Sequence, residues 1–293
     1  MIQVSENTIT ITPLNAPIGA EITGVDLSQE QSPKVMKMID DAYNKYNLLL
    51  FRNQQLTPDQ HIRFGASLGP LEIHVLKRYL LQSHPEILLI SNILREDGDF
   101  LGLPDAGQTW HTDTSYRQKP SRGSILYALE IPRDENQQAL GDTLFASTAA
   151  AYDDLTKELK DFLHGKKAIH RYSQRKRPVD SKREKLTKEQ LQETPDIAHP
   201  AVRTHPHTGR KALYLFEGEC VGIEGMPEEE GAKLISYLTQ HIIRPKYIYR
   251  HKWNEGDVIM WDNAASLHLA VCDYKLPQRR LLHRVTIEGG VPF

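Results

Sequence analysis

Ser-Ile-Leu-Tyr-Ala-Leu-Glu-Ile, residues 124–131, is a short and mostly apolar run of the length that a buried β-strand has. It belongs to a series, because after about residue 85 the chain consists largely of such segments. The predicted strands of this part are 87–93, 109–115, 124–131, 143–147, 168–172, 212–216, 248–252, 258–262 and 281–288. Many short strands in one chain favour a β-sandwich or barrel. We therefore predict a mainly β fold with flanking helices, a jelly roll, as a single domain over residues 1–293.

Helices and a few further strands are expected around this core. Residues 33–44 carry apolar side chains at helical spacing, and Thr57-Pro58 has the N-cap and first-turn proline that begin a second helix. Further helices are expected near 148–164 and 227–243. Strands are expected at 9–11, 20–25 and 47–52.

Composition limits the class of protein. Hydrophobic residues make up 39% of the 293 residues and charged residues 25%, which is typical of a globular protein, and the formal net charge is -2. This balance gives no bias toward nucleic acid or a membrane. The two cysteines, Cys220 and Cys272, cannot form a disulfide framework, and no signal peptide or membrane-spanning run is evident. We expect a soluble cytoplasmic protein.

Residues 173–198 differ from the rest of the chain because they are polar and heavily charged. We interpret them as a solvated insertion or as a lid over a site. A nucleic-acid contact is the alternative for the basic half, but this stretch lacks the interleaved aromatic residues on which bases stack.

The first chemical signal is Trp110-His111-Thr112-Asp113. On a β-strand, residues two apart point to the same face, so His111 and Asp113 could direct an imidazole and a carboxylate at one point. With 13 histidines in the chain, one such pair is expected by chance, so it needs support from elsewhere.

His268 supplies that support, because it ends the segment 261–268 after a strand-like run. Two histidines and one carboxylate, with open positions left on the metal, form the facial triad of non-haem Fe(II) oxygenases. Three ligands leave three octahedral positions, of which a cosubstrate can take two and dioxygen the third. A zinc site of a hydrolase is the alternative.

Two arginines complete the pattern. Arg280 and Arg284 lie four apart, so on a continuous strand they point to the same side. Arginine binds carboxylates bidentately and stays charged. The site could thus hold two different anions, whereas taken alone the two residues would indicate only a surface pair.

These motifs resemble those of the TauD/TfdA family of Fe(II)/2-oxoglutarate dioxygenases, over nearly the whole chain. The matching segments are Gly19–Ile22 with Gly24–Leu27, Trp110–Asp113, Gly141–Leu144, His199-Pro200 with Arg203–Pro206, Thr208–Tyr214, Trp261–Asn263 and Pro277–Arg284. Several motifs in the right order are far more specific than any one of them.

The resemblance implies a double-stranded β-helix with iron at its mouth, held by His111, Asp113 and His268. It implies that Arg284 binds the distal carboxylate of 2-oxoglutarate, with help from Thr143. It also implies that Arg280 holds the anionic group of the substrate and that His74 contacts it. Members of the family are often dimers or tetramers, so a homo-oligomer is expected.

Two residues depart from the pattern of the taurine enzymes. Glu219 stands where those enzymes have a phenylalanine, and Gly107 replaces an asparagine shortly before the first metal-binding histidine. Both changes fall on the substrate side, which puts taurine itself in doubt. Either Glu219 meets a polar group of the substrate, since a buried carboxylate needs a partner, or it faces solvent.

The predicted function is oxidation of a C–H bond in a small anionic sulfonate or carboxylate, with dioxygen consumed and 2-oxoglutarate converted to succinate and CO2. The alternatives are a metal-dependent hydrolase on the same scaffold and a non-catalytic binding protein for small anions.

Overall fold

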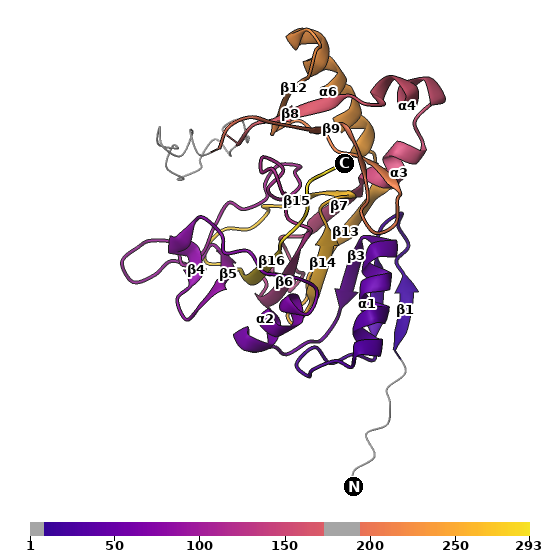
Figure 1. Ribbon diagram of the computed structural model, residues 1–293. Helices are drawn as coiled ribbons and strands as arrows, with labels where there is room; N and C mark the ends of the chain where they lie inside the picture. Colours follow the sequence, from indigo (N-terminus) through magenta and orange to yellow (C-terminus); the bar gives the residue numbers. More distant parts are fainter. Residues whose placement is uncertain (1–8, 173–193) are drawn as a thin grey trace.

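An eight-stranded sheet forms the larger layer of the computed structural model, which describes residues 9–172 and 194–293 (Figure 1). Its strands, in spatial order, are β1 (Thr10–Pro13), β2 (Ala20–Thr23), β3 (Leu48–Phe51), β14 (Val258–Asp262), β6 (Gly123–Glu130), β16 (Leu281–Ile287), β5 (His84–Ser91) and β4 (Leu80–Leu81). All neighbours are antiparallel except β2 and β3. Strands from both ends of the chain therefore meet in one sheet, with β16 between β6 and β5.

A second sheet faces the inner side of the first. It consists of β13 (Ile248–His251), β7 (Thr143–Ser147) and β15 (Ser266–Ala270). The space between the sheets is filled by large buried side chains, which are Leu126, Phe145, Trp253, Ile259, Trp261 and Leu282. Two sheets packed over such a core form the predicted jelly roll, and the mainly β fold is confirmed.

Two helices cover the outer face of the large sheet (Figure 1). In α1 (Pro33–Tyr46) the Ser32 side chain caps the first turn, and Asn47, at φ 59°, ends the helix. In α2 (Pro58–Ala66) Thr57 and Gln60 form the reciprocal capping box that fixes a helix start. The helices predicted from 33 and 57 are thus confirmed.

Smaller elements surround one end of the jelly roll. They comprise the sheet β12 (Cys220–Ile223), β8 (Lys167–His170) and β9 (Ile197–Pro200), the hairpin β10 (Val202–Thr204) and β11 (Lys211–Leu213), the helices α3 (Thr148–Asp153), α4 (Lys157–Leu163) and α6 (Glu228–Ile242), and the 3-10 turn Pro245–Tyr247. A second 3-10 turn, Lys77–Tyr79, precedes β4 at the edge of the large sheet. The single helix predicted over 148–164 is wrong, because Thr156 caps a new helix after a break. Within the described ranges, no helix is both long and apolar enough to cross a membrane.

One further prediction is wrong, and another falls mostly outside the described residues. Residues 109–115 do not form a strand, since only His111 makes a bridge, to His268, and the backbone then turns at Thr114, whose φ is 54°. The predicted insertion 173–198 lies mostly outside the described residues, and its last two residues belong to β9.

We expect the stability of the fold to decrease at acidic pH because of one buried histidine, His61. His61 on α2 is fully buried beside the Tyr127 ring, and burial, followed by the charge of His283, lowers its pKa to about 3. Below pH 6.5 the unfolded chain therefore binds a proton that the folded chain does not. We expect the free energy of unfolding to fall as the pH drops from 6.5 toward 3, with His61 accounting for about 2 kcal/mol of the loss at pH 5. Urea unfolding of His61→Phe should show a shallower pH dependence; an identical slope in both proteins would contradict this.

Candidate metal centre

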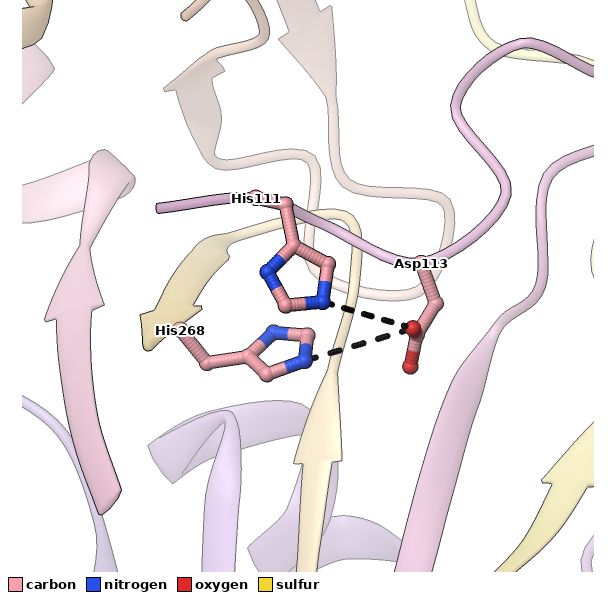
Figure 2. Close-up of side chains that lie close together, drawn as sticks. All are labelled: His111, Asp113 and His268. Atoms are coloured by element: carbon pink, nitrogen blue, oxygen red, sulfur yellow. Dashed lines mark ion pairs between the residues drawn. The ribbon is translucent and has the colours of Figure 1, made fainter. Parts of the chain in front are cut away.

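Three side chains converge at the mouth of the jelly roll (Figure 2). His111 precedes the turn at Thr114, and His268 lies on β15. The two backbones are joined by reciprocal hydrogen bonds, His111 N to His268 O at 3.1 Å and His268 N to His111 O at 2.8 Å. This bridge brings two residues 157 positions apart into contact, with ring centroids 4.0 Å from each other.

Asp113 completes the group from the same turn. Its Oδ1 lies 3.8 Å from Nε2 of His111 and 4.0 Å from Nε2 of His268, and all three residues are buried. Two metal–ligand bonds of about 2.1 Å can span such separations through one ion. Among the described residues this is the group of three or more His, Cys, Asp or Glu side chains close enough to hold a metal ion.

The protonation states suit a divalent ion. Nδ1 of His111 lies 2.7 Å from the Thr109 carbonyl, which places the proton on Nδ1 and makes Nε2 the nitrogen that would bind metal. Burial raises the pKa of Asp113. The nearby Arg284, His268 and His111 together lower it by more than burial raises it, so the pKa lies well below its usual range. The donor set therefore presents two imidazole nitrogens and an ionised carboxylate, as Fe(II) prefers.

One amide connects the two ligand-bearing segments. Oδ1 of Asn263 accepts hydrogen bonds from the Asp113 backbone N–H at 3.3 Å and from Nε1 of Trp261 at 3.1 Å. The Thr112 hydroxyl donates to both the carbonyl and Oδ1 of Asn263, at 2.9 and 3.2 Å. Asn263 thus fixes the turn before His268 against the segment that carries the other two ligands.

Replacing Asn263 by alanine is expected to weaken metal binding about 10- to 100-fold, as loss of an outer hydrogen-bond partner usually does. The physical reason is that the Asp113 amide and the Trp261 indole lose their buried acceptor. Metal dissociation constants from fluorescence titration with Mn(II) or Co(II) would measure it. Asn136→Ala, at an exposed loop position, is the control; equal affinities in the two variants would rule out the role of Asn263.

The two predicted arginines lie in different surroundings. Nη1 of Arg284, on β16, lies 3.2 Å from Oδ1 of Asp113. Arg280 precedes β16, and its Nη1 donates instead to the Gly141 carbonyl. The pairing of β16 with β6 shifts register between Leu281 and Leu282. The shift is an extra residue in β6, because Ala128 and Glu130 pair with consecutive residues of β16. Both arginines contact side chains between the two sheets, Arg280 at Trp253 and Arg284 at Asp113, as the spacing of four predicts.

Arg280 is grouped with Thr143. Its guanidinium lies over the Trp253 ring at 5.9 Å, and Nε1 of Trp253 donates to the Thr143 hydroxyl at 3.0 Å. Arg280 is only 3% exposed, and within the described part of the chain no carboxylate lies at ion-pairing distance from it. A buried cation of this kind requires an anion.

With the geometry established, comparison with known proteins is informative. Residues 10–286 match the protein family described as "Taurine catabolism dioxygenase TauD, TfdA family". The chain belongs to the TauD/TfdA family. The predicted family is confirmed, and with it the class of enzyme, a 2-oxoglutarate-dependent dioxygenase that uses Fe(II) and dioxygen.

Individual members of the TauD/TfdA family are similar over almost their full length. The α-ketoglutarate-dependent 2,4-dichlorophenoxyacetate dioxygenase of Cupriavidus pinatubonensis is 33% identical, covering 95% of this chain and 97% of that protein. The α-ketoglutarate-dependent sulfate ester dioxygenase of Pseudomonas putida is 31% identical, covering 97% and 91%. The crystal structure of AAD-2 in complex with Mn(II) and N-oxalylglycine has a TM-score of 0.81 at 28% identity, covering 97% of this chain and 99% of that one.

Glu219, which departs from the residue type of the taurine enzymes, is buried rather than turned to solvent. Its Oε2 accepts a hydrogen bond from the hydroxyl of Ser115, two residues after Asp113, and the same hydroxyl lies 3.0 Å from Nδ1 of His170. Burial, followed by the nearby His199, lowers the pKa of His170 to about 3, so this imidazole stays neutral. Glu219 and His170 therefore hold the turn that follows the metal-binding aspartate.

Gly107 and His74 are the remaining residues that the sequence singles out. Gly107 has φ +74°, and a Cβ there would lie 3.3 Å from Cε1 of His111, so glycine leaves space beside a metal ligand. His74 is half-buried, and its Nδ1 accepts from the backbone N–H of Leu76 at 3.1 Å. Asn263, by contrast, is a functional residue that the sequence reasoning missed, although it lies within the Trp261–Asn263 motif.

Proposed function

We propose that the protein oxidises a C–H bond of a small anionic organic compound, with 2-oxoglutarate as cosubstrate. The main support for this proposal is that two separate cations, Arg280 and Arg284, belong to the same site. Arg284 stands beside Asp113, and Arg280 is buried with Thr143, with no carboxylate of residues 9–172 or 194–293 at ion-pairing distance. Two anions, one for each cation, are what a dioxygenase with an acidic cosubstrate and an acidic substrate has to bind.

His111, Asp113 and His268 would hold the iron. When bound, the iron together with 2-oxoglutarate and dioxygen supplies the oxidising power, with succinate and CO2 as coproducts. The protein supplies position and charge. Ser124 donates to Oδ2 of Asp113 at 2.7 Å, which leaves Oδ1 facing both histidines.

We assign the distal carboxylate of 2-oxoglutarate to Arg280 and Thr143, instead of Arg284 and Thr143. Thr143 is paired with Ala270, two residues beyond His268 on β15. Two residues of strand cover about 6.6 Å, comparable with the length of a five-carbon dicarboxylate. A cosubstrate bound near His268 could therefore reach Thr143 and the guanidinium of Arg280.

Arg284 is then the anchor for the anionic group of the primary substrate, with His74 and Glu219 near the same end of the site. A metal-bound Asp113 would leave the guanidinium free to make a bidentate contact with a sulfonate, sulfate ester or carboxylate. The named relatives act on an aryloxyacetate and on sulfate esters. We therefore propose a substrate from these classes or from the sulfonates.

An anaerobic titration followed by a substrate screen tests the proposal. Adding 2-oxoglutarate to Fe(II)-loaded protein should give a weak visible charge-transfer band, which a zinc-type hydrolase would not show. On admission of air, at least one sulfonate, sulfate ester or aryloxyalkanoate should stimulate succinate release above the rate without it. Product formation without dioxygen, or no band, would favour the hydrolase.

We also propose a single domain, a homo-oligomer (dimer or tetramer) and a cytoplasmic location. The scarcity of cysteine supports the last of these. Light scattering on the purified protein would measure the oligomeric state.

A further inference from the structure

A second acidic residue lies next to the proposed substrate anchor. Glu72 follows Leu71, which bridges Ile287, and its backbone N–H donates to the carbonyl of Thr286 at 2.8 Å. Thr286 and Arg284 are two apart on β16, so they face the same side of the sheet. Glu72 therefore enters the site from a neighbouring segment, beside the anchor.

The Glu72 side chain is largely buried and carries a charge there. Nη1 of Arg117 lies 2.8 Å from its Oε2, and the side chain is 12% exposed. Burial raises the pKa of Glu72 above its usual range, although the ion pair with Arg117 lowers it in part, and Asp113 and Arg284 contribute in opposite directions. The direct ion pair favours the charged form of the carboxylate.

Four charges thus alternate beside the metal centre, two guanidiniums (Arg117 and Arg284) and two carboxylates (Glu72 and Asp113). Together they carry no net charge. A divalent ion and the dianionic cosubstrate also cancel, which leaves the charge of Arg280 uncompensated. The whole site then has an excess of one positive charge. Glu219 belongs to a separate group, with Ser115 and His170 on one side and with Tyr214, over which the buried cation Arg203 lies, on the other.

We propose that Glu72 is a specificity-determining residue, which restricts the anchor at Arg284 to substrates with a single negative charge. The inference rests on the proposed function and deepens it. A sulfonate, a sulfate ester or a carboxylate balances the site. A second negative charge on the substrate would lie close to Glu72 in a partly desolvated place, where like charges repel more strongly than in water.

A matched pair of anions tests this without turnover. Butane-1-sulfonate and butane-1-phosphonate have the same chain, and in mildly alkaline buffer they carry one and two charges. Calorimetry on Mn(II)-loaded protein with 2-oxoglutarate gives their dissociation constants. We expect the wild type to bind the sulfonate more tightly. Glu72→Gln should shift the ratio of the two constants toward the phosphonate by about tenfold or more, the size expected for removing one unit charge nearby.

Two further variants complete the test. Glu72→Asp keeps the charge and should keep the wild-type preference. Glu130→Gln, which removes a partly exposed acid paired with Arg279 at 3.1 Å, should change nothing.

If Glu72→Gln bound both anions more weakly by the same factor, or left both affinities unchanged, the ratio of the two dissociation constants would stay the same. Either result would overturn the inference, because a merely structural residue would affect the binding of both anions alike. Failure of the proposed function would appear differently. In that case wild-type protein would bind neither 2-oxoglutarate nor any anion dependent on Arg284.

Discussion

Replacing His111 by alanine should abolish succinate formation stimulated by the primary substrate. The variant loses one of three protein ligands, and the remaining pair, Asp113 and His268, cannot hold the ion in a fixed geometry. Outer-sphere substitutions at metal sites cost about 10- to 100-fold, so loss of a direct ligand should exceed about 100-fold in metal affinity and in activity. Metal content after dialysis and succinate release by chromatography measure the two effects.

A matched histidine separates the metal effect from a general loss of fold. His84 lies on β5 away from the triad, where Nε2 is 3.1 Å from the Asp59 carboxylate. His84→Ala should keep both iron and turnover. If His111→Ala kept full activity in the same assay, the assignment of the metal centre would fail.

The second prediction with a large expected effect concerns Arg280 and Arg284, which should affect the Michaelis constants of different compounds. Arg280→Gln should raise the Michaelis constant for the cosubstrate, and Arg284→Gln should raise the Michaelis constant for the primary substrate, each by about 30-fold or more. Losing one partner of a buried charge pair costs about 2–5 kcal/mol, which accounts for changes of this size. The measurement is succinate release while one of the two compounds is varied at saturation with the other.

Each arginine serves as the control for its neighbour, because the two are four residues apart and carry the same charge. The opposite pattern, with Arg284→Gln acting on 2-oxoglutarate, would restore the assignment that the family resemblance implied. Anaerobic binding of 2-oxoglutarate to the Mn(II) form of both variants gives the same comparison without turnover.

The convergence of His111, Asp113 and His268 could be predicted from residue types and order even though part of the reasoning failed. A strand over 109–115 would have placed His111 and Asp113 on one face. They converge instead through one bridge and a tight turn at Thr114. The chemistry of the donor set was more informative than the local periodicity, because only a few side chains can bind metal, whereas many sequences can form a short strand.

The arginines show where sequence reasoning reached its limit. A spacing of four suggested a shared face for Arg280 and Arg284, and both contact side chains between the sheets, Trp253 and Asp113. The spacing could not show which partner each guanidinium has, because these partners come from segments far away in the sequence. For the same reason Glu219 could be picked out as unusual but its partner Ser115 could not, since only the folded chain brings the two together.

The place of β16 in the large sheet has a consequence for biosynthesis. This strand fills the gap between β5 and β6, yet 150 residues lie between the end of β6 at Glu130 and Leu281, where β16 begins. At about 5–20 residues per second a ribosome needs roughly 8–30 s to cover that distance. During this time β5 and β6 lack the partner strand that joins them, and each leaves an open, aggregation-prone edge. Co-translational protection of these edges, and loading of iron only after release, would be required for this topology.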